Sequence, residues 1–301
     1  MVPLSRRAVL GMAAAGAAWA VVGCGGDGDG DGDGGSERPG PADEEDGVEV
    51  IAYGDDDELQ RGALSLPDGD GPHPVVVLVH GGFWRPEYDR SLMDPLAASV
   101  IAAGWAAWNI DYRPSGEGGG WPTTFTDVAA AVDHLDALAD EHGLDLERVA
   151  VVGHSAGGTL ALWSAARAGL PADAPGADPV VVPAAVVSQA GVANLAAGSL
   201  EALGRGAVDD LMGGSATTLG SRYGLASPIE RLPLGVPTYL VHGRADPIVP
   251  PVQSETYRDR AGDAGDDVTA ELLDGVDHFA VIDPDHSAWQ GVVDWLGEPL
   301  A

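Results

Sequence analysis

The sequence contains no lysine and few basic residues of any kind. All 15 basic side chains are arginine, against 47 aspartate and glutamate residues, which gives a formal net charge of −32 at pH 7. A surface this acidic repels polyphosphate, so we expect no nucleic acid among the partners of this protein. Net charge informs solubility rather than fold, and the acidity by itself therefore assigns no function.

Cysteine is nearly absent as well, because Cys24 is the single one in 301 residues. No disulfide can form within the chain, whatever the compartment. No histidine pair with nearby acidic or cysteine residues has the spacing of metal ligands, so we expect neither a metal nor another cofactor. Hydrophobic residues make up 45% and charged residues 21% of the chain, which is ordinary for a protein that buries a core.

The N-terminal apolar run is too short for a comfortable membrane-spanning helix. Residues 8–22 carry no charge and follow Arg6 and Arg7, but a spanning helix needs about 20 residues. A positive start, a short apolar core and a small-residue exit predict a secretory signal over residues 1–24, with a twin-arginine-like beginning. Its end, Val-Val-Gly-Cys, resembles a bacterial lipobox, and the resemblance implies a lipid on Cys24.

A segment of unusual composition separates this signal from the rest. Within residues 25–47, the first part, residues 25–35, consists of glycine and aspartate only, and residues 36–46 contain two prolines. Such a segment cannot build a core and predicts a flexible, self-repelling tether. We therefore expect an exported protein whose folded domain covers residues 48–301 and whose membrane contact is the lipid anchor alone. The sequence leaves the oligomeric state open.

Strand and helix patterns alternate through residues 48–301. The predicted strands cover residues 61–66, 75–79, 105–112, 149–152, 184–188, 238–241 and 268–272, and the predicted helices cover 91–103, 126–141, 156–168 and 287–296. This alternation predicts an α/β fold with a mostly parallel central sheet and helices on both faces. Residues 192–225, rich in glycine and alanine with weak periodicity, interrupt it and predict an irregular crossover or a small lid over the active site.

The strongest chemical signal is Gly153-His154-Ser155-Ala156-Gly157, which follows a buried strand and opens a helix. That context is typical of a nucleophile elbow, in which the turn is so tight that the residues two before and two after the serine must be small. The helix that follows points its N-terminus at the site and favours developing negative charge. We predict Ser155 as the nucleophile and Ala156 as one oxyanion donor.

A second motif, His80-Gly81-Gly82-Phe83-Trp84, directly follows the predicted strand 75–79. Acyl hydrolysis passes through a tetrahedral oxyanion that needs preorganised donors, and a Gly-Gly loop can turn its N–H groups inward. We expect the backbone N–H groups of Gly82 and Phe83 to be these donors. His80, Gly81 and Trp84 are interpreted as loop or pocket support, as is His154 in the elbow.

The remaining catalytic candidates follow two later strands. Asp246, in the segment His-Gly-Arg-Ala-Asp, can accept a hydrogen bond from an imidazole and stabilise the imidazolium. His278 would take the proton of the serine and return it to the leaving group, and the chain order Ser, Asp, His is that of α/β-hydrolases. His286 is the rival histidine, whereas His242 is interpreted as structural.

On these motifs the chain resembles the α/β-hydrolase superfamily, from about residue 75 to residue 278. The loop HGGFW together with GHSAG is similar to the esterase branch that includes kynurenine-formamidase-like and feruloyl- or acetyl-xylan-esterase-like proteins. The segments HGRADPIVP and DHF also resemble the catalytic domain of prolyl-oligopeptidase-type peptidases. Asn109 to Arg113 resembles the strand end of the esterase branch, where Tyr112 and Arg113 are interpreted as structural or pocket-lining residues.

The resemblance and the motifs together predict a serine hydrolase that cleaves carboxylic esters through an acyl-enzyme intermediate. Phe83, Trp84 and Trp121 are candidate walls of an apolar pocket for the acyl or aromatic part of a small-molecule substrate. Hydrolysis of an amide, by an arylformamidase-like enzyme or a small peptidase, is one alternative. A surface lipoprotein that binds ligands on a non-catalytic hydrolase scaffold is another, because a fold does not fix a function.

Overall fold

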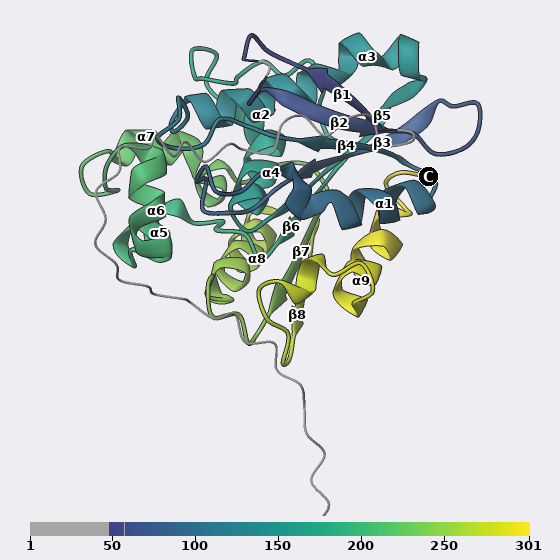
Figure 1. Ribbon diagram of the computed structural model, residues 1–301. Coiled ribbons are helices and arrows are strands. Elements are labelled where there is room, and N and C mark those ends of the chain that lie inside the picture. Colours follow the sequence, from purple (N-terminus) through teal and green to yellow (C-terminus); the bar gives the residue numbers. More distant parts are fainter. Residues whose placement is uncertain (1–47, 57) are drawn as a thin grey trace, which may run out of the picture. The chain divides into compact units, whose positions relative to one another are not determined.

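A computed structural model of the protein describes residues 48–56 and 58–301 (Figure 1). The expected signal over residues 1–24, its lipobox cysteine Cys24 and the tether over residues 25–47 lie outside the described residues. In the part of the chain that is described, no helix combines the length and the apolar character needed to cross a membrane.

Eight strands form one sheet in the order β1-β2-β4-β3-β5-β6-β7-β8. β1 pairs antiparallel with β2, and β2 pairs antiparallel with β4, whereas every pair from β4 onward is parallel. The predicted α/β class and its mostly parallel sheet are therefore confirmed. The bounds are β1 Val48–Ala52, β2 Arg61–Ser65, β3 His73–Val79, β4 Ala106–Ile110, β5 Leu144–His154, β6 Ala185–Gln189, β7 Thr238–Gly243 and β8 Val268–Leu273.

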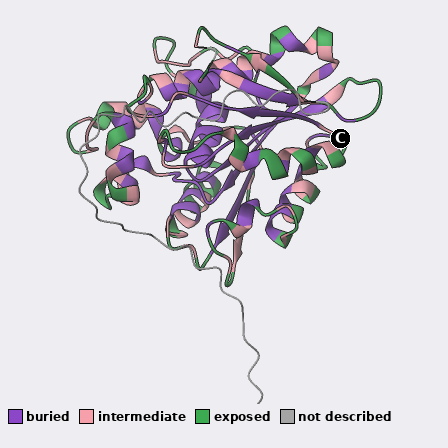
Figure 2. Ribbon diagram, in the orientation of Figure 1, coloured by how far each residue is buried: buried purple, intermediate pink, exposed green. Residues whose placement is uncertain are grey.

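The two faces of the sheet carry two separate apolar layers, because side chains alternate along each strand. In β3, Val75, Val77 and Val79 pack with one layer, while Val76 and Leu78 pack with the other. The first layer is covered by α2 (Thr123–Asp133), α3 (Leu135–His142), α4 (Ala156–Ala166) and α8 (Val252–Ala264). The second is covered by α1 (Asp94–Ala102) and α9 (Ser287–Leu296), so the central strands are buried on both sides (Figure 2).

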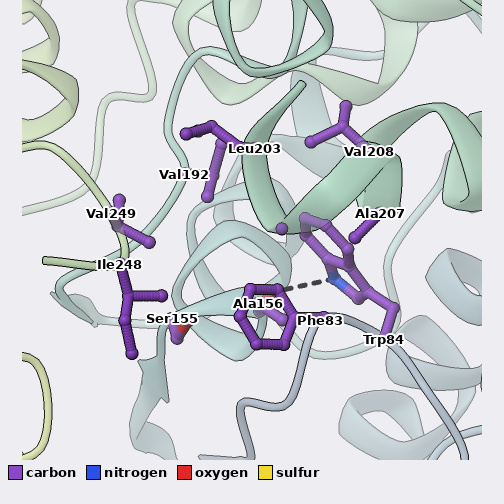
Figure 3. Close-up of a pocket in the computed structure, with 11 residues that line it drawn as sticks. Phe83, Trp84, Ser155, Ala156, Val192, Leu203, Ala207, Val208, Ile248 and Val249 are labelled. Carbon is purple, nitrogen blue, oxygen red and sulfur yellow. Dashed lines mark hydrogen bonds between the residues drawn. The ribbon is translucent and has the colours of Figure 1, made fainter. Parts of the chain in front are cut away.

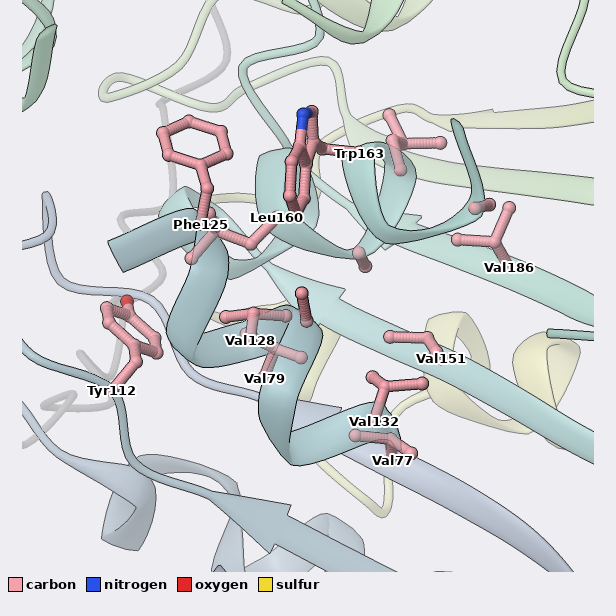
Figure 4. Packing of buried hydrophobic residues seen from close by; sticks show 14 of the residues in the cluster. Val77, Val79, Tyr112, Phe125, Val128, Val132, Val151, Leu160, Trp163 and Val186 are labelled. Atoms are coloured by element: carbon pink, nitrogen blue, oxygen red, sulfur yellow. The ribbon is translucent and has the colours of Figure 1, made fainter. Parts of the chain in front are cut away.

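Aromatic side chains tie the helices of the first layer together (Figure 4). The rings of Phe125 on α2 and Trp163 on α4 meet edge to face, with centroids 5.1 Å apart. The indole N–H of Trp163 donates to the carbonyl of Leu225 at 3.1 Å. Trp163 therefore joins the helix behind the predicted nucleophile to the segment between β6 and β7, which is part of the site described below.

Three parts of the fold differ from the sequence-based expectation. The helix expected over residues 126–141 is two helices, because the chain makes an i to i+3 bond from Ala137 to the His134 carbonyl where α2 ends. β1 and α8 were not predicted, since most β1 side chains are exposed and α8 buries few apolar residues. Neither element therefore shows the apolar periodicity on which the prediction relied.

Residues 192–225, predicted as an irregular crossover or a small lid, lie in the connection between β6 and β7 and are largely helical. It contains α5 (Leu195–Leu200), α6 (Leu203–Met212) and α7 (Gly220–Ala226), three short helices (Figure 1). The first turn of α6 has left-handed backbone at Gly204, Arg205 and Gly206. Such a turn carries no regular apolar repeat, which explains why the sequence pattern was weak here; a lid function of this segment stays a prediction.

Candidate active site

The turn between β5 and α4 holds Ser155 in a strained backbone conformation. Its φ is 53° and its ψ is −115°, in a region that non-glycine residues rarely adopt. Ser155 is 4% exposed and forms the N-cap of α4, and its N–H donates to the Gln189 carbonyl at 2.8 Å. The turn thus presents a buried serine at the carboxyl end of β5, where α/β sheets place functional groups.

The two flanking glycines are required by close backbone contacts. A Cβ on Gly153 would lie 2.1 Å from the Gly157 carbonyl oxygen, and a Cβ on Gly157 would lie 2.1 Å from the Val79 carbonyl oxygen. Neither contact is with a side chain that could rotate away. The expectation that the positions two before and two after the serine must be small therefore has a direct geometric cause.

The loop after β3 is folded back on itself beside this turn. Gly82, Phe83 and Trp84 have φ values of 109°, 57° and 56°, so three successive residues adopt positive φ. Among the described residues, no acceptor takes a hydrogen bond from the backbone N–H of Gly82, Phe83 or Ala156. Free N–H groups at a helix start and an adjoining turn are suited to stabilising an anion. The role of these three donors stays a prediction.

Hydrogen bonds and ring contacts connect this loop with the elbow and with the end of β4. The indole N–H of Trp84 donates to the Ala156 carbonyl at 3.1 Å. The Tyr112 hydroxyl donates to the His80 carbonyl at 3.0 Å, and the two rings stack at 4.3 Å. Burial lowers the pKa of His80, so its imidazole is neutral and serves as a packing surface. Gly81 lets the loop approach His154, because a Cβ there would lie 2.8 Å from the His154 Nδ1.

Asp246 and His278 meet at the ends of β7 and β8. The His278 Nδ1 and the Asp246 Oδ2 are 2.6 Å apart, and both side chains are almost fully buried. The other oxygen of Asp246 accepts from the backbone N–H groups of Ile248 and Val249 at 2.8 and 2.9 Å. Burial would raise the pKa of Asp246, but hydrogen bonds from two histidines and from backbone N–H groups outweigh it, so the pKa lies far below its ordinary value.

His242 is a second partner of this carboxylate. Its Nε2 lies 2.9 Å from the Val249 carbonyl and 3.2 Å from the Asp246 Oδ2. A carbonyl only accepts, so Nε2 carries the proton, and Nδ1 then accepts from the Ser254 hydroxyl at 2.8 Å. The sequence indicated only a structural histidine, and its spacing of four residues from Asp246 was the available signal.

His154 contacts His278 through a hydrogen bond and through its ring. Its Nε2–H donates to the His278 carbonyl at 3.0 Å, and the two rings are 4.7 Å apart. Burial, with a smaller contribution from the neighbouring His278, lowers the pKa of His154 to about 3. A neutral imidazole therefore links the residue before Ser155 to the loop that carries His278, and its supporting role in the site stays a prediction.

His286, the rival to His278, and Arg113, at the strand end predicted to be structural or pocket-lining, both make structural contacts. The His286 Nδ1 accepts from the Ala288 N–H at 3.0 Å and caps α9. Arg113 forms a bidentate pair with Asp127, at 2.8 and 2.6 Å. In the described residues, no group of three or more histidine, cysteine or acidic side chains is placed to hold a metal ion.

A small apolar pocket opens beside Ser155 (Figure 3). It encloses about 280 Å³ of empty space, part of it open to solvent. Its lining combines the elbow, the loop after β3, the loop after β7 and the crossover segment: Phe83, Trp84, Ser155, Ala156, Val192, Leu203, Gly204, Ala207, Val208, Ile248 and Val249. The crossover residues were not individually foreseen, because no local motif marks them.

Trp121 was wrongly predicted as a wall of this pocket, whereas Phe83 and Trp84 do line it. Trp121 packs against the hydrophobic core, edge to face with Phe125 at 5.0 Å between ring centroids. Its backbone N–H donates to the Leu211 carbonyl of α6 at 2.7 Å. The indole ring thus packs in the core on Phe125, and the backbone of Trp121 is bonded to α6.

The sequence matches one family model and three curated proteins. The family model described as BD-FAE matches residues 64–260. The chain is 31% identical over 204 residues to the esterase LipQ of Mycobacterium tuberculosis, which covers 64% of this chain and 46% of that protein. It is 35% identical over 127 residues to the esterase LipC of the same organism, covering 42% and 30%. The chain thus spans less than half the length of these two relatives.

Solved structures with a similar fold include esterases. A truncated carbohydrate esterase from gut microbiota superposes with a TM-score of 0.72 at 20% identity, covering 83% of this chain and 95% of that one. Esterase 2 of Thermogutta terrifontis with bound propionate gives a TM-score of 0.66 at 23% identity, covering 84% and 93%. At these identities the likeness concerns the fold, which together with the strand order is the α/β-hydrolase fold.

Proposed function

This chain belongs to the BD-FAE family, and from that membership and the geometry of its site we propose that it is a serine hydrolase that cleaves carboxylic esters. One observation carries the proposal. A strained serine turn and a histidine–carboxylate pair with a 2.6 Å contact lie at the carboxyl ends of β5, β7 and β8, which are parallel strands of one sheet. This is the constellation that acyl transfer requires.

In the proposed reaction Ser155 Oγ attacks the carbonyl carbon of the ester, while His278 accepts the hydroxyl proton. The C–O bond to the alcohol then breaks, and His278 returns the proton to the departing oxygen. Water repeats the sequence on the acyl-enzyme and releases the acid. Asp246 remains ionised throughout, because its lowered pKa favours the carboxylate, and it stabilises the imidazolium.

The oxyanion of each tetrahedral intermediate is assigned to the backbone donors of the two turns. The N–H groups of Gly82, Phe83 and Ala156 carry no other hydrogen bond within the described chain, so no bond has to be broken when the charge develops. Preorganised donors of this kind are worth about 3–4 kcal/mol each by mutation in other hydrolases. Trp84 keeps the loop at the elbow through its bond to the Ala156 carbonyl.

The apolar pocket is proposed to hold the acyl part of the ester. His278 is not among its lining residues, although Ser155, Ala156 and Phe83 are. Because the histidine protonates the leaving alcohol, the alcohol has to lie on the His278 side and the acyl chain on the opposite side. The pocket is small and its lining is mostly apolar, which favours short acyl chains.

The experiment that tests the proposal combines active-site labelling with a substrate panel. A fluorophosphonate should modify Ser155, as shown by peptide mass spectrometry, and Ser155→Ala should abolish both labelling and hydrolysis of p-nitrophenyl acetate while circular dichroism stays unchanged. Residual rate from the oxyanion site alone would be roughly a thousandfold over water. If the variant kept more than about a tenth of the activity, the nucleophile assignment would be wrong.

The same panel decides between the alternatives. Formanilides and peptide amides are offered beside the esters, because the same serine machinery can act on amides. Faster turnover of an amide than of any ester would replace the ester assignment with an arylformamidase-like or peptidase activity. An unlabelled serine and no turnover of any substrate would leave a non-catalytic binding protein on this scaffold.

We further propose export and lipid anchoring through Cys24, supported by the N-terminal sequence pattern. Anionic lipids repel the acidic chain, so the lipid has to supply the membrane affinity. Cys24→Ser should move the protein from the membrane fraction to the soluble fraction and remove the acyl-dependent mass increment. Native protein with an intact Met1 and a free Cys24 thiol would refute the proposal.

A further inference from the structure

The turn that opens α6 adopts an unusual run of left-handed backbone. Ala202, Gly204, Arg205 and Gly206 have φ values of 51°, 60°, 59° and 87°. For the two non-glycine residues this conformation costs on the order of 1–3 kcal/mol each, and it persists only when the surroundings hold it. Leu203 and Gly204 of this turn line the pocket, so whatever holds the turn also shapes the pocket.

Arg85 supplies such a hold from the oxyanion loop. Its guanidinium donates to the Gly204 carbonyl at 2.8 Å, across 119 positions of sequence. The same group lies 3.8 Å from the Asp210 carboxylate on α6 and 5.5 Å from the centre of the Phe83 ring. The exposed contact with Asp210 is weak, as surface ion pairs generally are. The bond to the carbonyl is therefore the stronger link.

Gly204 and Phe83 are in direct contact under this link. A Cβ on Gly204 would lie 2.4 Å from the Phe83 Cδ1, so the ring lies against the glycine backbone. The guanidinium of Arg85 approaches the same ring, which suits a cation–π contact. The Phe83 ring thus lies against both the Gly204 backbone and the Arg85 guanidinium, and the Phe83 N–H is one of the three proposed oxyanion donors.

We propose that Arg85 is a positioning residue that clamps the α6 turn onto Phe83 and so sets the length of acyl chain the site accepts. The proposal rests on the ester-hydrolase function above. With the clamp closed, Leu203 and Gly204 limit the pocket. With the clamp removed, the strained turn relaxes, the pocket extends between the loop and α6, and longer acyl chains gain contacts that short chains cannot use.

The test is the ratio of kcat/KM for p-nitrophenyl hexanoate to that for p-nitrophenyl acetate. Arg85→Ala should raise this ratio about tenfold, the discrimination that one to two methylene groups give in an apolar pocket. Loss of folded enzyme lowers both rate constants equally and leaves the ratio unchanged, so the ratio separates specificity from stability. Arg260→Ala, an exposed arginine on α8 that does not line the pocket, is the matched control.

Two further variants locate the effect. Asp210→Asn keeps the bond from Arg85 to the Gly204 carbonyl and should leave the ratio unchanged. Arg85→Lys can donate to that carbonyl but cannot also present a planar cation to Phe83, so an intermediate ratio is expected. If Arg85→Ala is recovered unfolded, Arg85→Lys carries the test alone.

The outcomes are distinct from those of the proposed function. An enzyme that hydrolyses both esters with the same ratio in wild type, Arg85→Ala and Arg260→Ala would overturn the clamp and leave the ester hydrolase intact. A ratio that falls in Arg85→Ala would also overturn it. Absence of ester hydrolysis in the wild type, with Ser155 unlabelled, would instead refute the function on which the clamp rests.

Discussion

The pocket beside Ser155 has two walls of different construction. The first wall is formed by the elbow and the loop after β3, which extend directly from the buried strands β5 and β3. A Cβ on Gly153 or Gly157 of the elbow would lie 2.1 Å from a backbone carbonyl oxygen. The second wall, from residues 192–225, is made of short helices; its Gly204 contacts the Phe83 ring, but Gly220 and Gly224 of α7, which do not line the pocket, face open space. The elbow therefore has no room for an added side chain, whereas parts of the second segment have.

This difference separates two tasks of a hydrolase. Catalytic groups need positions fixed to fractions of an ångström, which a turn locked between backbone segments provides. Substrate size needs a wall that can be altered without disturbing those positions. We therefore expect changes in the first wall to act on rate and folding, and changes in the second to act mainly on which ester is preferred.

The largest effect is expected at the histidine–carboxylate pair beside the first wall. His278→Ala should lower kcat as much as Ser155→Ala, because such residues act as a unit. Asp246→Asn keeps the shape but loses the charge, and a fall of about ten-thousandfold is expected, less than for the histidine. Steady-state kinetics with p-nitrophenyl acetate measure both. An inactive His286→Ala beside an active His278→Ala would reverse the assignment.

Matched glycine substitutions compare the walls in stability. Gly157→Ala places a methyl 2.1 Å from the Val79 carbonyl oxygen and should destabilise the fold by about 3 kcal/mol or more, seen as a lower urea midpoint. Gly224→Ala, inside α7 with nothing nearby, should stabilise by about 0.5–1 kcal/mol. Equal midpoints for the two variants would contradict the distinction between the walls.

Acid should lower the free energy of unfolding through His154, which lies in the elbow. Its pKa is about 3 in the folded protein and 6.5 ordinarily, so between these values the unfolded chain binds a proton that the folded chain does not. The free energy of unfolding therefore falls as the pH drops from 6.5 towards 3, by up to about 1.4 kcal/mol per pH unit. Urea titrations from pH 7.5 to 4.5 should show a smaller slope for His154→Asn. His142→Asn, at the end of α3, is the control, and equal slopes in both variants would remove His154 from this account.

The smallest effect is expected from trimming the second wall. Leu203→Ala enlarges the pocket and should raise the hexanoate-to-acetate ratio of kcat/KM by about tenfold, with kcat for acetate little changed. Leu200→Ala removes the same atoms from a side chain that is 72% exposed on α5 and should leave the ratio as it is. Equal ratios in both variants would show that the acyl chain lies elsewhere.

The buried strands, the elbow and the histidine–carboxylate pair could be predicted from the sequence. The buried strands could be located because unbroken valine runs have one stable environment, the middle of a parallel sheet. The elbow could be located because its glycines are a local steric requirement, and the structure gives that requirement a distance of 2.1 Å. The pairing of Asp246 with His278 followed from chain order in a known fold, and the two side chains lie in contact.

Tertiary structure alone decided how the pocket is closed. The Trp121 ring packs in the core against Phe125, although an aromatic residue is equally compatible with a pocket wall. His242 became a second partner of Asp246, and Arg85 reached Gly204 across 119 positions. None of these contacts has a local pattern, because each depends on how segments far apart in the chain are packed. Local sterics and periodicity are visible in a sequence, whereas the meeting of distant side chains is fixed only when the sheet and its crossover have formed.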